Sequence, residues 1–245
     1  MKSIIKSLVA LFIASAVSST ANAGENLNYQ DLTDILVDKQ RPIADAKRDE
    51  ARKPAEIMHF SEISKGDHVL DLFSGSGWYS ELFSMAVGDN GKVYAQNDSV
   101  IWRFAENGIN KRTENSRLSN VIRLDKVEII HMSMKDKSID LVFTALNYHD
   151  LFFTHSARDG KIAKVRDKAI DHKQALANIK RVMKDDGIFV IIDHMGIAGS
   201  GFNAPNDTHR IDPDIVGRMA RADLDVDGFR RDQAGVQEWY GKCCG

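Results

Sequence analysis

Asp67-His68-Val69-Leu70-Asp71-Leu72-Phe73-Ser74-Gly75-Ser76-Gly77-Trp78-Tyr79-Ser80-Glu81-Leu82-Phe83-Ser84 is the stretch that decides the fold of this chain. The apolar run at residues 69–73 predicts a buried strand, and apolar residues at helical spacing from Trp78 onward predict a helix. Gly75 and Gly77 lie between the two, and glycine lets the backbone approach a ligand closely. Because a helix N-terminus presents free N–H groups, this strand, glycine loop and helix predict a site for a nucleotide-like cofactor.

The spacing in the loop separates three kinds of nucleotide site. A P-loop needs a Gly-Lys-Ser/Thr ending and a dinucleotide site needs three glycines as G-x-G-x-x-G, and neither is present. An acidic residue, Asp71, is followed by Gly75 and Gly77, with Phe73 at the first glycine position. This pattern resembles motif I of the class I S-adenosylmethionine-dependent methyltransferases. The resemblance implies that the cofactor contacts Asp71, Ser74, Gly75, Ser76 and Gly77, while a tight turn without a ligand remains the alternative.

Composition indicates an ordinary globular protein. The chain has 245 residues, 43% of them hydrophobic, which predicts one domain of the larger kind with a sizeable core. Its 33 basic and 35 acidic residues give a net charge of −2. Since no basic cluster with interleaved aromatic residues is present, we expect no nucleic-acid partner.

The N-terminus predicts export. Lys2 and Lys6 precede an apolar run at residues 7–17, and Ala21-Asn22-Ala23 forms an A-x-A cleavage pattern before Gly24. A membrane anchor needs about 20 apolar residues, which is longer than this run, and no other stretch is long enough to span a bilayer. We therefore predict a signal peptide at residues 1–23 and a periplasmic or secreted protein without a stable membrane span. Cys243 and Cys244 are adjacent at the end of the chain, which excludes a disulfide that holds the core.

Residues 24–60 are predicted to be an N-terminal leader and helices, followed by a methyltransferase-like domain at residues 61–245. Residues 24–35 are polar and predict a mobile leader, and Pro54 suits the first turn of a helix over residues 55–60. The string Arg48-Asp49-Glu50-Ala51-Arg52-Lys53-Pro54-Ala55-Glu56 resembles the opening of a bacterial group of predicted, often exported, class I methyltransferases. A solvated amphipathic helix explains the same charges.

Strands and helices alternate along the rest of the domain. Strands are predicted at 92–96, 120–124, 139–146 and 188–192, and helices at 99–107, capped by Ser99, and at 173–183, followed by a turn at 184–187. This order predicts an α/β fold, a Rossmann-like three-layer sandwich with a mostly parallel sheet. The family closes its sheet with an antiparallel hairpin. Residues 223–245 show no clear pair of alternating strands, so we expect this C-terminal hairpin to be incomplete.

The resemblance also implies residues for the nucleoside part of the cofactor. In the family, an acidic residue at the end of the second strand binds the ribose hydroxyls. Here that strand ends in Gln96-Asn97-Asp98, so Asn97 is the aligned residue and Asp98 follows one position late. A carboxylate in a later loop holds the adenine amino group, for which Glu128 is the first choice and Asp125 the second.

A second group of polar residues follows the fourth and fifth strands. Asn147-Tyr148-His149-Asp150 and Asp193-His194 are expected at the same edge of the sheet, with His209-Arg210-Ile211-Asp212 in a later loop. The three strings resemble the same methyltransferase group, and the resemblance covers roughly residues 45–216. We assign catalysis to His149, His194 and Asp150, a cofactor contact to Asn147, and no resident metal.

The chemistry of this group leaves alternatives open. Histidine titrates near neutral pH, so His149 or His194 can deprotonate a methyl acceptor. His149, Asp193, His194 and His209 are also residue types that bind a divalent metal. In a third interpretation these groups only hydrogen-bond one another and hold the loops in place.

The predicted function is S-adenosylmethionine-dependent methyl transfer to a small molecule. The alternative is an exported, non-catalytic binding protein that kept the fold. A metal-dependent hydrolase is disfavoured because the chain has no H-E-x-x-H or G-x-S-x-G string.

Overall fold

The computed structural model describes residues 26–158, 161–223, 226–231 and 237–243. These residues form a seven-stranded sheet with the strand order β3-β2-β1-β4-β7-β9-β8 and a separate two-stranded sheet, β5-β6. The predicted signal peptide at residues 1–23 lies outside the described residues, as does Cys244. In the described part of the chain, every helix is too short or too polar to cross a lipid bilayer.

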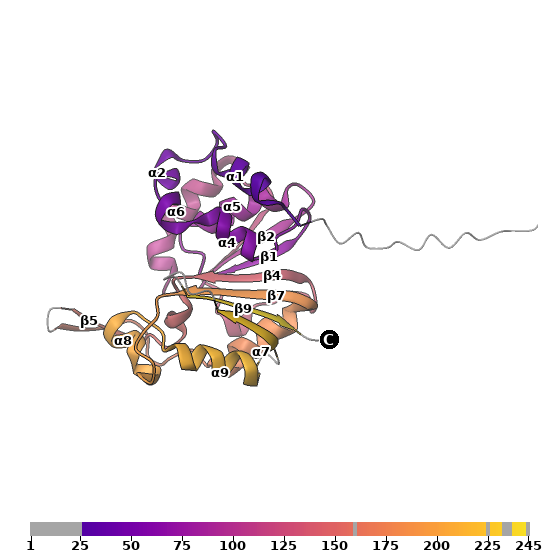
Figure 1. Ribbon diagram of the computed structural model, residues 1–245. Coiled ribbons are helices and arrows are strands. Elements are labelled where there is room, and N and C mark those ends of the chain that lie inside the picture. Colours follow the sequence, from indigo (N-terminus) through magenta and orange to yellow (C-terminus); the bar gives the residue numbers. More distant parts are fainter. Residues whose placement is uncertain (1–25, 159–160, 224–225, 232–236, 244–245) are drawn as a thin grey trace, which may run out of the picture.

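Five parallel strands form the centre of the large sheet, and two antiparallel strands extend one edge (Figure 1). The strands are β1 (His68–Leu72), β2 (Lys92–Asn97), β3 (Val121–Asp125), β4 (Ile139–Ala145), β7 (Met183–Asp193), β8 (Val226–Arg231) and β9 (Gln237–Cys243), and the small sheet contains β5 (His155–Arg158) and β6 (Lys161–Lys164).

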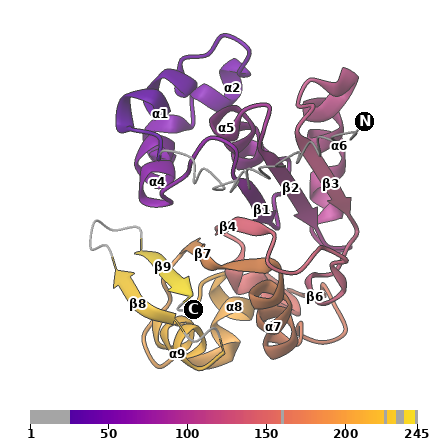
Figure 2. The same cartoon turned by 90° about the vertical axis from the view of Figure 1, so that its right-hand side faces the viewer.

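Helices cover both faces of the sheet, with α1, α4 and α5 on one side and α7 and α9 on the other (Figures 1 and 2). The helices are α1 (Tyr29–Leu36), α2 (Ile43–Ala46), α3 (Asp49–Arg52), α4 (Pro54–Phe60), α5 (Trp78–Val87), α6 (Trp102–Thr113), α7 (His172–Val182), α8 (Ala204–Thr208) and α9 (Pro213–Asp223). Short 3-10 helices are η1 (Glu114–Ser116), η2 (Ile129–His131), η3 (Tyr148–Leu151) and η4 (Gly201–Asn203).

The core is divided by the sheet because successive side chains of a strand point to opposite faces. In β1, Val69 packs in the cluster that contains Met58 of α4 and Phe83 of α5. Leu70 packs in the opposite cluster, which contains Ile179 of α7. This arrangement confirms the predicted Rossmann-like three-layer sandwich with a mostly parallel sheet.

The prediction of a mobile leader over residues 24–35 is wrong from Asn28 onward. Asn28 and Asp31 form a capping box, in which each side chain accepts a hydrogen bond from the other residue's backbone N–H. Leu32 of this helix, α1, is fully buried. The polar residues of this segment therefore form a helix cap and the outer face of α1. The other face of α1 packs in the core.

The expectation of an incomplete C-terminal hairpin is also wrong. Strand β9 pairs antiparallel with β7 over six residue pairs, from Ile188↔Lys242 to Asp193↔Gln237, and β8 pairs with β9. The pairing of β8 is irregular between Asp227 and Arg230. Such an irregularity disturbs the period-2 pattern by which strands are recognised in a sequence.

Two local predictions are corrected as well. The Oδ1 atom of Asp98, and not Ser99, accepts hydrogen bonds from the backbone N–H groups of Val100 and Ile101. The following helix α6 starts at Trp102 and extends to Thr113. The turn predicted at 184–187 is a bulge within β7, because the pairing with β4 steps from Ile139↔Met183 to Leu141↔Ile188.

Candidate functional site

The glycine loop follows β1 and has the backbone that its sequence requires. Gly75 and Gly77 have φ angles of +57° and +77°, in the left-handed region that favours glycine. A Cβ atom at Gly75 would meet nothing within 4 Å, whereas one at Gly77 would lie 2.6 Å from the Ile109 side chain. Gly77 therefore allows α6 to pack against the loop, and Gly75 leaves the other side of the loop open.

A cavity of about 170 Å³ lies against this open side. Five of the predicted cofactor contacts line it, namely Asp71, Ser74, Gly75, Ser76 and Asn147. The Nδ2 atom of Asn147 donates hydrogen bonds to the carbonyl oxygens of Phe73, at 2.9 Å, and Ala145, at 3.1 Å. The end of β4 is thereby tied to the glycine loop, and the cavity lies between them.

Charged side chains line two sides of this small cavity. Asp71 is buried and its Oδ2 atom accepts a hydrogen bond of 2.6 Å from the Ser80 hydroxyl. Burial raises the pKa of Asp71 to about 7. On another side, the guanidinium groups of Arg48 and Arg52 lie 5.4 and 5.1 Å from the centre of the Trp78 ring. The two cations offer a binding place for an anionic group at the start of α5.

The predicted ribose contacts lie at the end of β2 and are engaged within the protein. Asn97 ends this strand, and its Oδ1 atom accepts a hydrogen bond from the Gly75 N–H at 2.8 Å while Nδ2 donates to Ser74 Oγ at 3.0 Å. Asp98 is fully buried, accepts hydrogen bonds from the N–H groups of the turn before α6 and pairs with Arg166 at 2.9 Å. Asp98 therefore holds this turn and pairs with Arg166, while Asn97 lies directly against the glycine loop.

Of the predicted adenine contacts, Asp125 is the last residue of β3 and Glu128 lies in the loop after it. Glu128 Oε1 accepts a hydrogen bond from the Ser99 N–H at 3.3 Å, so this carboxylate lies next to the end of β2. Asp125 pairs with Arg123 at 2.6 Å. Sequence reasoning missed Arg166, whose Nε and Nη2 atoms are buried without a hydrogen-bond partner in the described part of the chain. These nitrogens are unused donors beside Asp98.

A second cavity, of about 780 Å³, shares four wall residues with the first: Arg52, Tyr79, Ala145 and Leu146. Helix α4 supplies one wall, including Ile57 and Phe60. The end of β7 supplies another wall, which includes the exposed residue His194. His194 is thus the one predicted catalytic residue that lines this cavity.

The other predicted catalytic residues lie in a buried group that we call the histidine cluster, formed by His149, Asp150, Asp193 and His209. The Nδ1 atom of His149 lies 2.9 and 3.0 Å from the two carboxylate oxygens of Asp193. Its Nε2 atom lies 3.3 Å from His209 Nδ1 and 3.9 Å from Asp150 Oδ1. His194 does not belong to this cluster, although it follows Asp193 directly.

Burial and charge set the pKa values of two residues in the histidine cluster. Burial lowers the pKa of His149, but the hydrogen bond and charge of Asp193 outweigh burial, and the pKa lies above its usual value. Burial raises the pKa of Asp150 to about 6.

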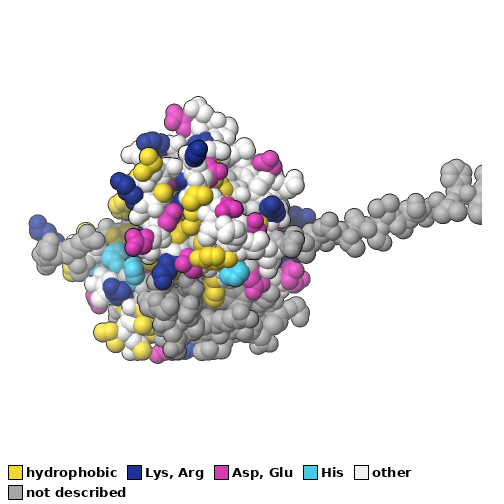
Figure 3. All heavy atoms as spheres, turned by 45° about the horizontal axis from the view of Figure 1, so that its top comes forward, with side chains coloured by type: hydrophobic (Ala, Val, Ile, Leu, Met, Phe, Trp, Pro, Cys, Tyr) yellow, Lys and Arg dark blue, Asp and Glu magenta, His cyan; other side chains and the backbone are white. Residues whose placement is uncertain are grey.

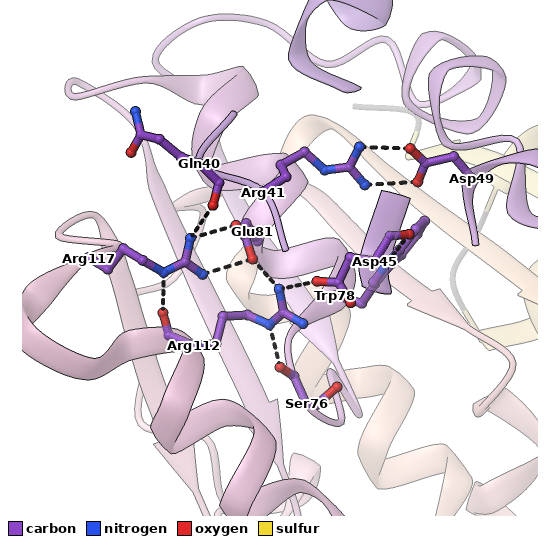
Figure 4. Close-up of polar contacts among 9 residues, drawn as sticks. All are labelled: Gln40, Arg41, Asp45, Asp49, Ser76, Trp78, Glu81, Arg112 and Arg117. Carbon is purple, nitrogen blue, oxygen red and sulfur yellow. Dashed lines mark hydrogen bonds and ion pairs between the residues drawn. The ribbon is translucent and has the colours of Figure 1, made fainter. Parts of the chain in front are cut away.

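The structure also shows an ion-pair network behind the glycine loop that the sequence did not reveal (Figure 4). We call it the arginine network: Arg112 pairs with Asp45 and Glu81, Arg117 pairs with Glu81, and Arg41 and Asp49 form a separate pair beside them. Arg112 donates from Nε to the Ser76 carbonyl at 2.7 Å and pairs with Asp45 and Glu81. No local pattern signals these contacts, because the paired residues lie 31 and 67 positions apart.

A family model described as a methyltransferase domain matches residues 63–209. The matched segment is more than half of the chain and includes the glycine loop and the histidine cluster. The chain belongs to this methyltransferase family. A search of curated proteins found no match to this methyltransferase.

Solved structures of methyltransferases share the fold. A SAM-dependent methyltransferase from Aquifex aeolicus is 22% identical, with a TM-score of 0.59 over 89% of this chain and 99% of that chain. A putative S-adenosylmethionine-dependent methyltransferase from Methanococcus maripaludis is 15% identical, with a TM-score of 0.52 over 84% and 96%. Phosphoethanolamine N-methyltransferase 2 from Haemonchus contortus, in complex with S-adenosylmethionine, is 13% identical, with a TM-score of 0.51 over 74% and 38%.

The methyltransferase uses S-adenosylmethionine, as predicted, and its small cavity fits the amino-acid part of this cofactor. The open side of Gly75 leaves room for a ligand, and Arg48 and Arg52 suit a carboxylate. Asp71 and the N-terminus of α5 provide further polar contacts. Membership in the family supports methyl transfer and gives no support to a non-catalytic binding protein.

Proposed function

We propose that this methyltransferase methylates a small organic acceptor with an apolar body and an anionic group, bound in the larger cavity. The observation that carries this proposal is the wall that the two cavities share, formed by Arg52, Tyr79, Ala145 and Leu146. A molecule in the larger cavity is therefore adjacent to the place where the amino-acid part of the cofactor fits.

The lining of the larger cavity supports this class of acceptor. A volume of about 780 Å³ falls in the range of small-molecule sites. Its apolar residues include Ile57, Phe60 and Ile192, which favour an aromatic or aliphatic body. Arg52, Lys53 and Arg210 contribute three cations to the wall. Glu56 and Asp193 are the acids there, and the carboxylate of Asp193 is already bonded to His149.

The chemistry divides between the cofactor and the chain. S-adenosylmethionine, when bound, supplies a methyl group on a positively charged sulfur, which makes that methyl electrophilic. The glycine loop, Asp71 and Asn147 would hold the donor, and the buried Tyr79 would keep water from the shared wall. An imidazole nitrogen of His194 takes the acceptor proton, because His194 is the histidine of the predicted pair that lines the larger cavity.

Calorimetric titration of the mature protein, starting at Gly24, tests the cofactor site. We expect S-adenosylmethionine and S-adenosylhomocysteine to bind with micromolar affinity, about −8 kcal/mol. The Gly75→Arg variant is the matched control, since its side chain would project from the open side of the loop. No heat at millimolar cofactor from a folded sample would contradict this part of the proposal.

Transfer of a labelled methyl group to a panel of small acceptors tests the acceptor class. Aryl and alkyl acids that also carry a hydroxyl or amine group should be methylated at that second group, whose proton passes to His194, and their neutral amide analogues should be poor acceptors. Arg210→Met should raise KM for the acids, and His194→Ala should lower kcat with cofactor affinity retained. Equal rates for acids and neutral analogues would exclude the anionic class.

The proposal excludes nucleic acid as the acceptor. The chain has a net charge of −2, and on the face drawn in Figure 3 basic and acidic side chains are interspersed. Phosphate backbones are bound by concentrated positive charge, so the mixed charges of this face support the exclusion. A gel-shift assay with duplex DNA and structured RNA should show no complex at physiological salt.

The proposal also places the protein outside the cytoplasm, as in the exported bacterial group that the sequence resembles. The n-region, apolar run and A-x-A pattern of residues 1–23 support it. Fractionation of cells that express the full chain should recover a protein whose first residue is Gly24. Full-length protein confined to the cytoplasm would contradict this part.

A further inference from the structure

We infer that His149, Asp150 and His209 form a binding site for a divalent transition metal of the zinc class. One atom from each side chain lies within 4.8 Å of the others. Two imidazole nitrogens and one carboxylate oxygen are a donor set that suits Zn²⁺ and neighbouring first-row ions better than Mg²⁺ or Ca²⁺. The site goes beyond methyl transfer and does not depend on the proposed acceptor.

The position of Asp193 supports a metal-binding role for His149. Asp193 accepts a hydrogen bond from the backbone N–H of His149 at 2.8 Å, and its carboxylate lies against the Nδ1 atom. A carboxylate there holds the proton on Nδ1, so the Nε2 lone pair points away from it, toward His209 and Asp150. Metal-binding histidines commonly have this second partner on the other ring nitrogen, where it orients the ring.

His209 is held in place by its backbone and by a neighbouring ring. It ends α8 with a φ angle of +50°, a left-handed conformation that costs energy for any residue other than glycine. Its ring packs at 4.2 Å from the centre of the Phe153 ring and stands at 86° to the ring of His149. This arrangement brings the Nδ1 atom of His209 to 3.3 Å from the Nε2 atom of His149.

Charge around the site favours a bound cation. Asp150 is buried, and two further buried carboxylates, Asp98 and Asp193, are close enough to raise its pKa. Arg166 is the guanidinium that lowers the pKa of Asp150. With both histidines neutral, as metal binding requires, Asp98, Asp150 and Asp193 carry three negative charges against the one positive charge of Arg166. Buried charge needs compensation, and a divalent ion at His149, Asp150 and His209 would supply it.

A bound ion would link two segments that lie far apart in the sequence. His149 and Asp150 belong to η3, after β4, while His209 follows α8. The ion would therefore stabilise the carboxyl edge of the sheet, beside the larger cavity, whose wall contains Asp193 and Arg210.

Metal titration of the full mature chain tests the site. The protein is stripped with a chelator and carries Cys243→Ser and Cys244→Ser, so that the adjacent terminal thiols do not bind metal. We expect one Zn²⁺ or Co²⁺ per chain by calorimetry and elemental analysis, a visible d–d absorption band with Co²⁺, and a higher melting temperature with metal.

Two variants test the ligands and a third is their control. His209→Asn keeps a residue that tolerates the left-handed backbone, and His149→Gln keeps a polar side chain, and each should weaken Zn²⁺ binding at least tenfold and abolish the metal-dependent rise in melting temperature. His131→Asn, an exposed histidine outside the cluster, should leave both unchanged. No saturable binding of either ion to the folded chain would overturn the inference. So would binding that both cluster variants retain, or binding of Mg²⁺ in preference to Zn²⁺.

Discussion

The arginine network and the histidine cluster are both charged, and each has a buried carboxylate at its centre, Glu81 and Asp193, yet they differ in how their charges are balanced. The network pairs three arginines with three carboxylates, and Glu81, with a side chain 2% exposed, lies between Arg112 and Arg117 (Figure 4). The histidine cluster and its described neighbours contain three buried carboxylates, Asp98, Asp150 and Asp193, while Arg166 is the guanidinium that pairs with Asp98 and acts on Asp150. In the arginine network the charges cancel within the chain. In the histidine cluster the surplus of negative charge suits a bound cation.

The location of each cluster agrees with this difference. The arginine network lies behind the glycine loop and contacts it through the bond from Arg112 to the Ser76 carbonyl. Arg112 does not line the cofactor cavity but supports the loop that does. The histidine cluster lies at the ends of β4 and β7, where ligands of parallel sheets bind. The first is therefore a supporting structure and the second a place for chemistry or metal.

Removal of Glu81 should have the largest effect. Glu81→Ala leaves Arg112 and Arg117 without their shared carboxylate in a buried place, and we expect a loss of about 3–5 kcal/mol in the free energy of unfolding. Urea unfolding measures this loss. Asp125→Ala, which removes a partly exposed partner of Arg123, is the control and should cost less than about 1 kcal/mol. Similar losses in both variants would show that the network is not the supporting structure described here.

Asp71 is a third kind of buried carboxylate. Its partner is the Ser80 hydroxyl, whereas Glu81 pairs with two arginines. Its pKa is raised from 3.8 to about 7 in the folded protein, so between these values the folded state binds more protons than the unfolded state. Stability contributed by this group is present below pH 4 and is lost as pH rises toward 7.

The Asp71→Asn variant lacks this titration. The difference in unfolding free energy, wild type minus variant, should therefore fall by up to about 4 kcal/mol between pH 4 and pH 8. Urea unfolding of both proteins across this range measures it. A difference that stays constant or rises with pH would contradict the raised pKa.

A substitution at Gly108 tests packing beside the arginine network without changing any charge. A Cβ atom at Gly108 would lie 2.4 Å from Ser76 Cβ, one helical turn before Arg112 contacts the same residue. Gly108→Ala should therefore cost about 1–3 kcal/mol through overpacking and weaken cofactor binding by moving the loop. Gly199→Ala is the control for binding, because its φ angle of +81° makes alanine cost stability there although the new Cβ meets nothing within 4 Å. Unchanged cofactor affinity in Gly108→Ala would show that the loop position is set elsewhere.

Asp150 should show the smallest effect, with a sign opposite to that of Glu81. In metal-free protein, Asp150→Asn removes one of three negative charges that share one guanidinium, and we expect a gain of about 1 kcal/mol in stability. With Zn²⁺ present, the same variant should be less stable than wild type. Thermal unfolding with and without metal measures both, and a loss in metal-free protein would contradict the surplus of negative charge.

Sequence patterns predicted the parts of this fold that depend on neighbouring residues. The apolar run at 69–73 and the loop at Gly75 and Gly77 gave β1, the turn and α5 nearly to the residue. Asn28 and Asp31 are a readable capping box, so the missed helix α1 had a local signal. The hairpin of β8 and β9 had none, because backbone pairing with β7 positions strands that lack alternation.

In the candidate site, too, the residues whose positions depend on local sequence were predictable. Asp71, Ser74 and Asn147 lie at the small cavity because their positions follow from strand ends. The separation of His194 from His149 was missed although strand alternation points Asp193 and His194 to different sides; the side on which His149 lies is set by its bond to Asp193, which only the folded chain shows. Contacts such as Arg112 with Asp45, 67 positions apart, require the folded chain.

The wall that α4 supplies to the larger cavity has an evolutionary consequence. Ile57 and Phe60 precede the segment shared with the family, which begins at residue 63, whereas the glycine loop lies inside it. Substitutions at Ile57 and Phe60 can therefore reshape one wall of the larger cavity while the glycine loop stays as the family has it. The wall at the end of β7, with Ile192 and His194, lies inside the shared segment, so the two walls of one cavity can evolve separately.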